Sequence, residues 1–331
     1  MSLAAWIGGP GPLLVLVTAL VLDGLLPPVP GPFRYLPHPV RVLGGAIGFL
    51  DRKLNRPSRS EASRKVRGAL AAVLTIALAG GFGWLIAWAA RGLPFGWIWE
   101  LLLVTSLLAQ RSLFDHARAV LRPLQTGDLA RARGAVAHLV GRDPESLDRH
   151  GVARATVESL AENFSDGVLA PAFWYLVLGL PGLCAYKAIN TLDSMIGYRT
   201  PRHASFGMVS ARLDDLANWI PARIAVGVIA LAALITPSAR PFAALRSALR
   251  DAPRHRSPNA GWTEAAFAGA LGLALAGPRR YGGRVVEDAW MGDGRARLEL
   301  ADLRRALGLF AASCLVTLGI VAGVAVLVTR I

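Results

Sequence analysis

Long apolar stretches alternate with arginine-rich polar stretches along this chain of 331 residues. Two windows, 66–90 and 309–329, reach the roughly 20 apolar residues that an α-helix needs to cross a bilayer. Windows 12–29 and 97–110 are shorter and each carries an acidic residue, so they are weaker candidates. The pattern predicts an all-α fold, namely that of a polytopic α-helical integral membrane protein.

Two further apolar windows, 168–186 and 221–236, are predicted to be embedded in the membrane without fully crossing it. The first contains Pro181-Gly182, and the second has only 16 residues. Broken backbone is tolerated at membrane depth where it is buried in protein or lines a polar cavity. We therefore interpret both windows as re-entrant or interfacial hairpins.

The polar stretches predict which side of the membrane each loop faces. Residues 30–65, 111–167 and 237–308 are rich in arginine, and such loops stay on the cytoplasmic side. The short turn at 91–96 is then expected outside. Residues 1–331 are thus interpreted as a single membrane-embedded domain with three cytoplasmic polar segments.

Composition narrows the class of protein. The chain is 53% hydrophobic and only 18% charged, whereas a soluble domain carries about 25% charged residues. The net charge is +14, but the arginines flank apolar windows and no basic, aromatic-interleaved module appears, so we expect no nucleic-acid partner. The two cysteines have no zinc spacing, and no Walker loop, GxSxG or HExxH motif is present. A nucleotide would have to be held without a Walker loop.

Three acids, Glu158, Glu162 and Asp166, follow one another at steps of four. On one α-helix they would stack roughly 6 Å apart, which is unfavourable for like charges. Either Arg149 and Arg154 neutralise them on a solvated face, or they bind a cation. Carboxylate oxygens suit Mg²⁺ that is held partly by substrate phosphates.

A second polar cluster lies in residues 186–223. Asn190 and Asp193 share a helix face at i, i+3, as do Asp214 and Asn218 at i, i+4. Polar groups beside apolar windows usually mark function in membranes, although an ion-pair network that fixes helix packing is the alternative. Further candidates in this cluster are Lys187, Arg199, Arg202, Arg212, Asp215 and Arg223.

Two helix starts can be located from turn residues. Gly127-Asp128 should begin a helix that stops at Gly141. The turn at 257–261, with Ser257 and Asn259, should begin another that Gly277-Pro278 closes. The start of the second helix could bind a phosphate or carboxylate, or it could be an ordinary capped helix.

Several long blocks of this sequence resemble a known family. They are "RATVESLAENFSDGVLAP", "YKAINTLDSMIGYRT", "FGMVSARLDDLANWIPARI" and "SPNAGWTEAAFAGALG". These blocks are similar to the signature blocks of the integral-membrane adenosylcobinamide-phosphate synthases of cobalamin biosynthesis. The similarity extends over nearly the whole chain, and the blocks show no clear departure from the family pattern.

The resemblance implies an ATP-dependent amide ligation with Mg²⁺. Family members join adenosylcobyric acid to (R)-1-amino-2-propanol or its O-phosphate, giving adenosylcobinamide or its phosphate. The implied location is the bacterial inner membrane, with the active site facing the cytoplasm. Self-association, or assembly with other membrane enzymes of cobalamin synthesis, stays open.

The residue patterns can be matched to this implied chemistry. Catalytic candidates are Glu158, Glu162, Asp166 and Asp193. Metal-ligand candidates are Glu158, Glu162, Asp193, Asp214 and Asp215. Substrate- or phosphate-binding candidates are Lys187, Asn190, Arg199, Arg202, Arg212, Arg223, Ser257 and Asn259. Two alternatives are a Mg²⁺-dependent membrane prenyltransferase and a non-enzymatic membrane sensor or transporter.

Overall fold

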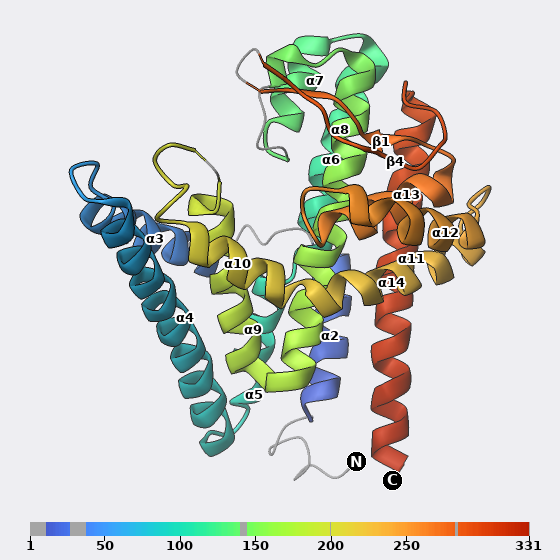
Figure 1. Cartoon of the computed structure of the whole chain (residues 1–331). Coiled ribbons are helices and arrows are strands. Elements are labelled where there is room, and N and C mark those ends of the chain that lie inside the picture. The colour runs from blue at the N-terminus through green and yellow to red at the C-terminus, as the bar shows by residue number, and fades with distance from the viewer. Residues whose placement is uncertain (1–10, 27–37, 140–143, 199, 282–283, 331) are drawn as a thin grey trace. The chain divides into compact units, whose positions relative to one another are not determined.

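The computed structural model describes residues 11–26, 38–139, 144–198, 200–281 and 284–330, and its regular structure is almost entirely helical (Figure 1). This confirms the predicted all-α class. Contacts divide the chain into two compact units, each described by itself below. The first unit comprises 1–109, 170–218 and 321–331, and the second comprises 110–169 and 219–320. The single membrane-embedded domain stays a prediction.

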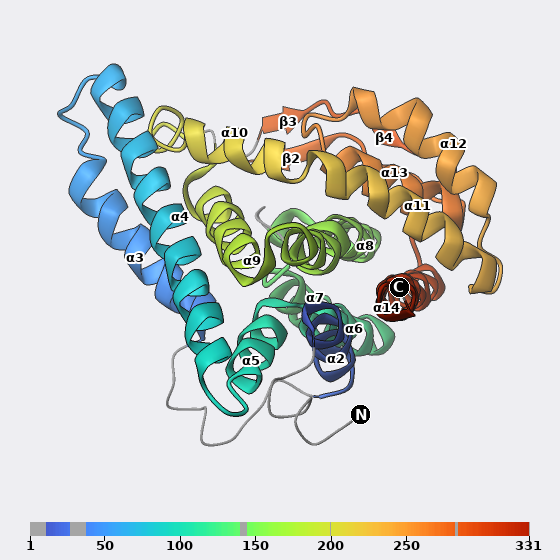
Figure 2. The same cartoon turned by 90° about the horizontal axis from the view of Figure 1, so that it is seen from below.

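Six helices build most of the first unit. They are α2 (Pro12–Leu25), α3 (Pro39–Leu54), α4 (Glu61–Gly92), α5 (Trp97–Leu107), α9 (Ala170–Ile196) and α10 (Met208–Ala217). The long helix α4 packs along α9, and α3 and α10 also contact both of these helices (Figure 2). The unit is therefore organised around α9.

Helix α4 turns small side chains inward and large apolar ones outward. Its buried positions include Gly68, Ala71 and Gly83, while Leu78 and Trp84 are 64% and 60% exposed. A Cβ on Gly83 would lie 2.8 Å from the carbonyl oxygen of Leu180 on α9, so only glycine permits this close approach. Small residues at helix contacts and large apolar residues facing away are typical of membrane helices.

The helix assigned as α9 reverses direction at Gly179. That residue has φ 66° and ψ −159°, which is not helical. A Cβ on Gly182 would lie 2.6 Å from the carbonyl oxygen of Trp174, eight residues earlier, whereas eight residues of a straight helix span about 12 Å. Ala170 and Tyr186 pack in one core cluster for the same reason. Residues 170–178 and 180–196 are thus two arms of a helical hairpin (Figure 1), as the Pro181-Gly182 pair predicted for window 168–186.

The second unit combines helices with two short hairpins. Its helices are α6 (Gln110–Thr126), α7 (Leu129–Val136), the short η2 (Pro144–Ser146), α8 (Arg149–Phe164), η3 (Ser165–Leu169), α11 (Trp219–Ile235), α12 (Pro241–Asp251), η4 (Ala252–Arg254) and α13 (Ala260–Leu271), together with most of α14 (Leu300–Arg330). Strand β1 (Leu275–Ala276) pairs with β4 (Trp290–Met291), and β2 (Arg279–Tyr281) with β3 (Arg284–Val286), both antiparallel. Helices α11, α12 and α13 pack side by side (Figure 2).

The two predicted helix starts are confirmed, and one predicted end is wrong. Asp128 caps α7 by accepting a hydrogen bond from the backbone N–H of Arg131; the predicted stop at Gly141 lies outside the described residues. Helix α13 begins after the cap residue Asn259 but ends at Leu271, not at Gly277-Pro278. Gly272, in the left-handed conformation with φ 68°, terminates it, and the following residues form strands.

Three helical segments in the described residues are long and apolar enough to cross a membrane. They are Glu61–Gly92, Arg149–Ile196 and Leu300–Val328; α10 and α11 together make a fourth only if they count as one broken span. The strong window 66–90 falls within the first segment, and 309–329 overlaps the third up to its end at Val328. Helix α2 has only 14 residues and α5 only 11, in keeping with their rank as weaker candidates. Which side each loop faces stays a prediction.

Candidate active site

A hydrogen-bonded polar cluster joins α9 and α10 in the first unit. Asp214 accepts hydrogen bonds from both neighbouring amides, at 3.0 Å from Asn218 and 3.5 Å from Asn190. Asn218 in turn accepts a hydrogen bond of 2.9 Å from the hydroxyl of Tyr186. The spacing of four predicted that Asp214 and Asn218 share a helix face, and in the structure their side chains are hydrogen-bonded. We call Tyr186, Asn190, Asp193, Asp214 and Asn218 the α9–α10 cluster.

Negative charge is concentrated at this cluster. Asp193 lies three residues after Asn190 on α9, and its charge repels those of Asp214 and Asp215. Carboxylates so placed are stabilised when a cation or a proton offsets their charge.

Among the described residues, no three His, Cys, Asp or Glu side chains lie close enough to hold a metal ion by themselves. Mg²⁺, however, often uses one or two carboxylates and completes its shell with water and substrate phosphates. Asp193 and Asp214 fit that mode of binding, with the Asn190 amide oxygen as a further oxygen donor.

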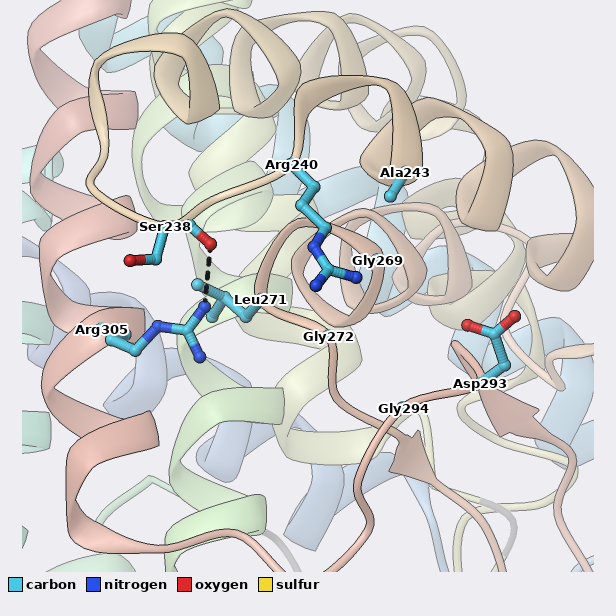
Figure 3. A pocket seen from close by; sticks show the side chains of 9 residues that line it. All are labelled: Ser238, Arg240, Ala243, Gly269, Leu271, Gly272, Asp293, Gly294 and Arg305. Carbon is cyan, nitrogen blue, oxygen red and sulfur yellow. Dashed lines mark hydrogen bonds between the residues drawn. The ribbon is translucent and has the colours of Figure 1, made fainter.

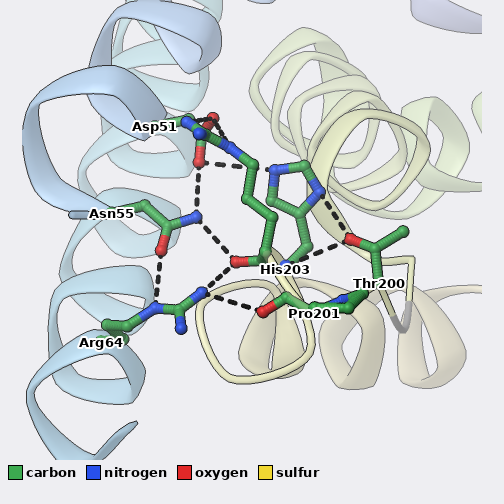
Figure 4. Close-up of polar contacts among 7 residues, drawn as sticks. Asp51, Asn55, Arg64, Thr200, Pro201 and His203 are labelled. Carbon is green, nitrogen blue, oxygen red and sulfur yellow. Dashed lines mark hydrogen bonds and ion pairs between the residues drawn. The ribbon is translucent and has the colours of Figure 1, made fainter. Parts of the chain in front are cut away.

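The loop between α9 and α10 is fastened to α3 and α4 (Figure 4). Arg202 donates to Oδ2 of Asp51 from Nε at 3.1 Å and from Nη2 at 2.6 Å. Asn55 and Arg64 both donate to the carbonyl oxygen of Arg202. His203 approaches the other oxygen of Asp51 at 3.5 Å. The guanidinium of Arg202, a predicted phosphate contact, is thus engaged by an acid of its own chain.

Asp51 is held ionised by these contacts. Burial by itself would raise the pKa of its carboxyl group, but hydrogen bonds from Asn55 and Arg202, with the charge of Arg202, lower that pKa below its ordinary value. The loop is therefore tied down by an ion pair that persists at neutral pH.

The remaining basic candidates of the first unit occupy different environments. Lys187 is buried, with 8% exposure, and its charge adds to desolvation in lowering the pKa of His38. Arg212 is exposed on α10. Arg199 lies outside the described residues. Among the described basic site residues of this unit, Arg202 and Arg212 are both exposed, but only Arg202 is engaged by an acid, Asp51.

Glu158 has a structural role in the second unit. Its carboxylate is buried, with 5% exposure, and Oε1 accepts a hydrogen bond of 2.8 Å from the backbone N–H of Ala276. The guanidinium of Arg154 lies 3.6 Å from the same oxygen and stacks over the Trp290 ring. Arg154 therefore pairs with Glu158 as the alternative reading of the three acids predicted, but in a buried position and not on a solvated face.

Glu162 and Asp166 differ from Glu158 in their surroundings. Glu162 is exposed on α8, and Asp166 is partly exposed. Helix α8 ends at Phe164, and Asp166 lies in the π-helical turn η3, so the α-helical spacing of four does not continue through all three acids. Single π-turns inside α-helices are frequent at functional sites.

Arg223 is held between two indole rings in the second unit. Its guanidinium carbon lies 4.5 Å from the Trp219 ring centroid and 4.8 Å from that of Trp262. It also donates a 2.9 Å hydrogen bond to Oδ1 of Asn259. Ser257 Oγ accepts from the backbone N–H groups of Asn259 and Ala260. Three predicted binding residues thus meet at the start of α13, where the Ser257 hydroxyl stabilises the turn that precedes the helix.

The structure brings the predicted site residues together in two groups, one in each unit. Lys187, Asn190, Asp193, Arg202, Arg212, Asp214 and Asp215 belong to the first unit, and Glu158, Glu162, Asp166, Arg223, Ser257 and Asn259 to the second. That the two groups share one pocket stays a prediction. Sequence reasoning missed Asp51, Asn55 and Arg64. The sequence offered one signal, the amide Asn55 within the basic stretch "DRKLNR", but its burial is seen only in the structure.

Comparison with known proteins matches residues 16–310 to the family described as CobD/Cbib protein. This chain belongs to that family. It is 49% identical over 319 residues to the cobalamin biosynthesis protein CobD of a Sinorhizobium species, covering 95% of this chain and 98% of that one. The same-named proteins of Rhizobium meliloti and Rhodobacter capsulatus are each 47% identical, covering 91% and 89% of this chain and 93% and 92% of theirs. No solved structure matches.

Membership of the CobD/Cbib family confirms the resemblance seen in the sequence blocks and gives the chain a role in cobalamin biosynthesis. Its apolar helices are those of a membrane protein.

Proposed function

We propose that this CobD/Cbib protein is a membrane enzyme that attaches the aminopropanol arm to the corrinoid. The substrates are adenosylcobyric acid and (R)-1-amino-2-propanol or its O-phosphate, and ATP drives the condensation. Near full-length similarity to cobalamin biosynthesis proteins carries the proposal. It also favours this reaction over a membrane prenyltransferase and over a non-enzymatic sensor or transporter.

The reaction takes place in two steps, a phosphoryl transfer to the corrinoid carboxylate and then the formation of the amide bond. A carboxylate oxygen of the corrinoid acid attacks the γ-phosphorus of ATP, which forms an acyl phosphate and releases ADP. The amine then attacks the acyl carbon, the C–O bond to phosphate breaks, and inorganic phosphate leaves with the bonding electrons. The ammonium group must lose a proton before this attack, so a positioned base accelerates it.

The α9–α10 cluster supports the phosphoryl-transfer half of this proposal. Mg²⁺, when bound, would offset negative charge on the phosphate oxygens. Asp193 and Asp214 would hold it, while Asn190 and Asn218 orient the Asp214 carboxylate. Arg212 would contact the transferred phosphate.

Glu162 is the better candidate for the base. Glu158 is buried and bound to Ala276 and Arg154, whereas Glu162 is exposed and so can be reached by an incoming amine. The proposed location is the bacterial inner membrane, with these groups facing the cytoplasm.

Reconstitution tests the proposal. The full chain in detergent or vesicles is supplied with adenosylcobyric acid, aminopropanol phosphate, Mg²⁺ and ATP, and the amide product is sought by mass spectrometry. Product should require all four and should fall by roughly 10-fold or more in Asp214→Asn, because a proposed Mg²⁺ ligand is lost. The matched control is Glu61→Gln, an exposed carboxylate at the start of α4. Absence of product from folded protein with intact substrates would refute the proposed reaction.

A further inference from the structure

Helix α12 has one face packed against protein and one face exposed. Its buried side consists of Ala244, Ser247, Ala248 and Asp251. On the opposite side Phe242 is 79% exposed and Leu249 69%, with Leu245 between them at 37%. Positions i, i+3 and i+7 form one helical stripe, and α12 is only 11 residues long. It cannot cross a bilayer, but its stripe is that of a helix lying in the membrane surface.

The exposed apolar surface continues onto α11, against which α12 packs. Leu231, Leu234 and Ile235 at the end of α11 are 48%, 65% and 64% exposed. Arg246 and Arg250 lie on the exposed parts of α12 beside the apolar stripe. Large apolar side chains bordered by arginines match the boundary between acyl chains and headgroups.

A pocket of about 600 Å³ opens at the corner between α11 and α12 (Figure 3). Arg240, just before α12, and Arg305, near the start of α14, both line it. The guanidinium of Arg240 makes no hydrogen bond or ion pair with the described residues, and Figure 3 shows it pointing toward Gly269 and Gly272. The pocket therefore contains an uncompensated positive charge.

Arg305 leaves part of its hydrogen-bonding capacity unused. It donates from Nη2 to the carbonyl oxygen of Ser238 at 3.1 Å, and Nη1 lies 3.7 Å from Asp302. Its Nε is buried and has no hydrogen-bond partner within the described part of the chain. A buried donor without a partner is costly, and an anion in the pocket would supply one.

One acid, Asp293, also lines the pocket. It is bound by Arg250 at 2.8 Å, and Arg250 also pairs with Asp251 at 2.7 Å, so the charge of Asp293 is offset in part from outside the pocket. Two arginines and one partly neutralised acid line the pocket, and the net charge of its lining is therefore positive.

We propose that this pocket binds the phosphate headgroup of an anionic phospholipid, whose acyl chains lie along the exposed side chains of α11 and α12. Two arginines recognise the phosphate, and the adjoining apolar stripe is what distinguishes a lipid from a soluble phosphate. This binding goes beyond the proposed ligation and does not depend on it.

Lipid retention tests the proposal. The full chain is reconstituted in vesicles of phosphatidylcholine mixed with phosphatidylglycerol, extracted in mild detergent, and examined by native mass spectrometry for retained phosphatidylglycerol. Arg240→Gln should weaken retention about fivefold, and Arg240→Gln with Arg305→Gln roughly 25-fold. The single variant should fold normally, because the Arg240 side chain has no partner in the described chain.

The control is Arg304→Gln, which removes an exposed charge from α14 outside the pocket. It should retain phosphatidylglycerol as the wild type does. Unchanged retention in Arg240→Gln, or equal loss in Arg304→Gln, would overturn the proposal. Displacement of the lipid by ATP or inorganic phosphate at millimolar concentration would overturn it too, since the pocket would then be a site for a soluble phosphate.

Discussion

Glu158 and Ala276 are joined by a buried hydrogen bond, 2.8 Å from the backbone N–H of Ala276 to the carboxylate of Glu158. Ala276 has φ 57°, in the left-handed region that residues with a side chain seldom adopt. The acid therefore stabilises a strained turn between β1 and β2, 118 residues away in sequence.

Glu158→Gln is expected to fold, because the amide oxygen can still accept the bond from Ala276. Glu158→Ala leaves that N–H unsatisfied in a buried position, so the free energy of unfolding should fall by roughly 2 kcal/mol. Thermal unfolding in detergent measures the stability of both variants. Equal stability of the two variants would show that the hydrogen bond contributes nothing.

Glu162→Gln should retain the fold and lose turnover. The side chain is exposed, so its stability should change by less than about 0.5 kcal/mol, while removal of a general base should lower kcat by roughly 100-fold. The control is Glu287→Gln, another exposed acid of the second unit. Wild-type turnover in Glu162→Gln would eliminate it as the base.

The Asp251 carboxylate should make the free energy of unfolding depend on pH in the acid range. Burial would raise the pKa of this carboxyl group, but hydrogen bonds from Arg250 and from the backbone N–H of Gly292 lower it below its ordinary value. A lowered folded-state pKa contributes stability above the unfolded pKa, near 4, and that stability is lost as pH falls through the folded pKa.

The check is the difference in unfolding temperature between wild type and Asp251→Asn. It should stay constant above about pH 5 and narrow below about pH 4. Glu287→Gln should show little difference throughout. If the difference in unfolding temperature between wild type and Asp251→Asn stays constant down to about pH 2, the ionised Asp251 carboxylate does not stabilise the fold.

Arg223→Lys should cost about 1 kcal/mol of stability, because lysine cannot lie flat between the rings of Trp219 and Trp262. Arg212→Lys is the matched comparison. Because Arg212 is exposed, the stability of this variant should equal that of the wild type. The loss of a bidentate phosphate contact should instead raise its KM for ATP. Unfolding curves and steady-state kinetics of both variants separate the two roles. Unchanged stability in Arg223→Lys would mean that the stacking is energetically neutral.

Local sequence patterns predicted the structural features that depend on residues close together in the chain. The helix start at Asp128, the Asp214–Asn218 pair and the break near Pro181 all follow from spacings of a few residues, and the structure contains each of them. The attachment of Arg202 to Asp51 joins residues 151 positions apart. No local pattern specifies that contact, because it depends on how α3 packs against α9.

The sequence also did not show which of the acids are buried and which are exposed. Steps of four placed Glu158 and Glu162 as equals, yet the first is buried under a strand and the second is exposed. The end of α13 was misplaced for a related reason. Gly272 and Gly277 both have positive φ, and only the strand pairing of residues 275–276 determines which of them ends the helix.

Gly197 tests whether the placement of Asp193 matters for catalysis. It follows the last residue of α9, and a Cβ at this position would clash with the carboxylate of Asp193. Gly197→Ala should therefore displace that carboxylate and lower kcat by roughly 100-fold.

The control is Gly45→Ala, since a Cβ at Gly45 meets nothing within 4 Å. The new Cβ of Gly197→Ala would also lie 2.7 Å from the backbone carbonyl oxygen of Asp193. If Gly197→Ala is also unstable, adding Asp193→Ala should therefore remove only the side-chain part of the clash and recover part of the unfolding temperature, without restoring turnover. Full activity in Gly197→Ala and in Asp193→Ala would remove this carboxylate from the site.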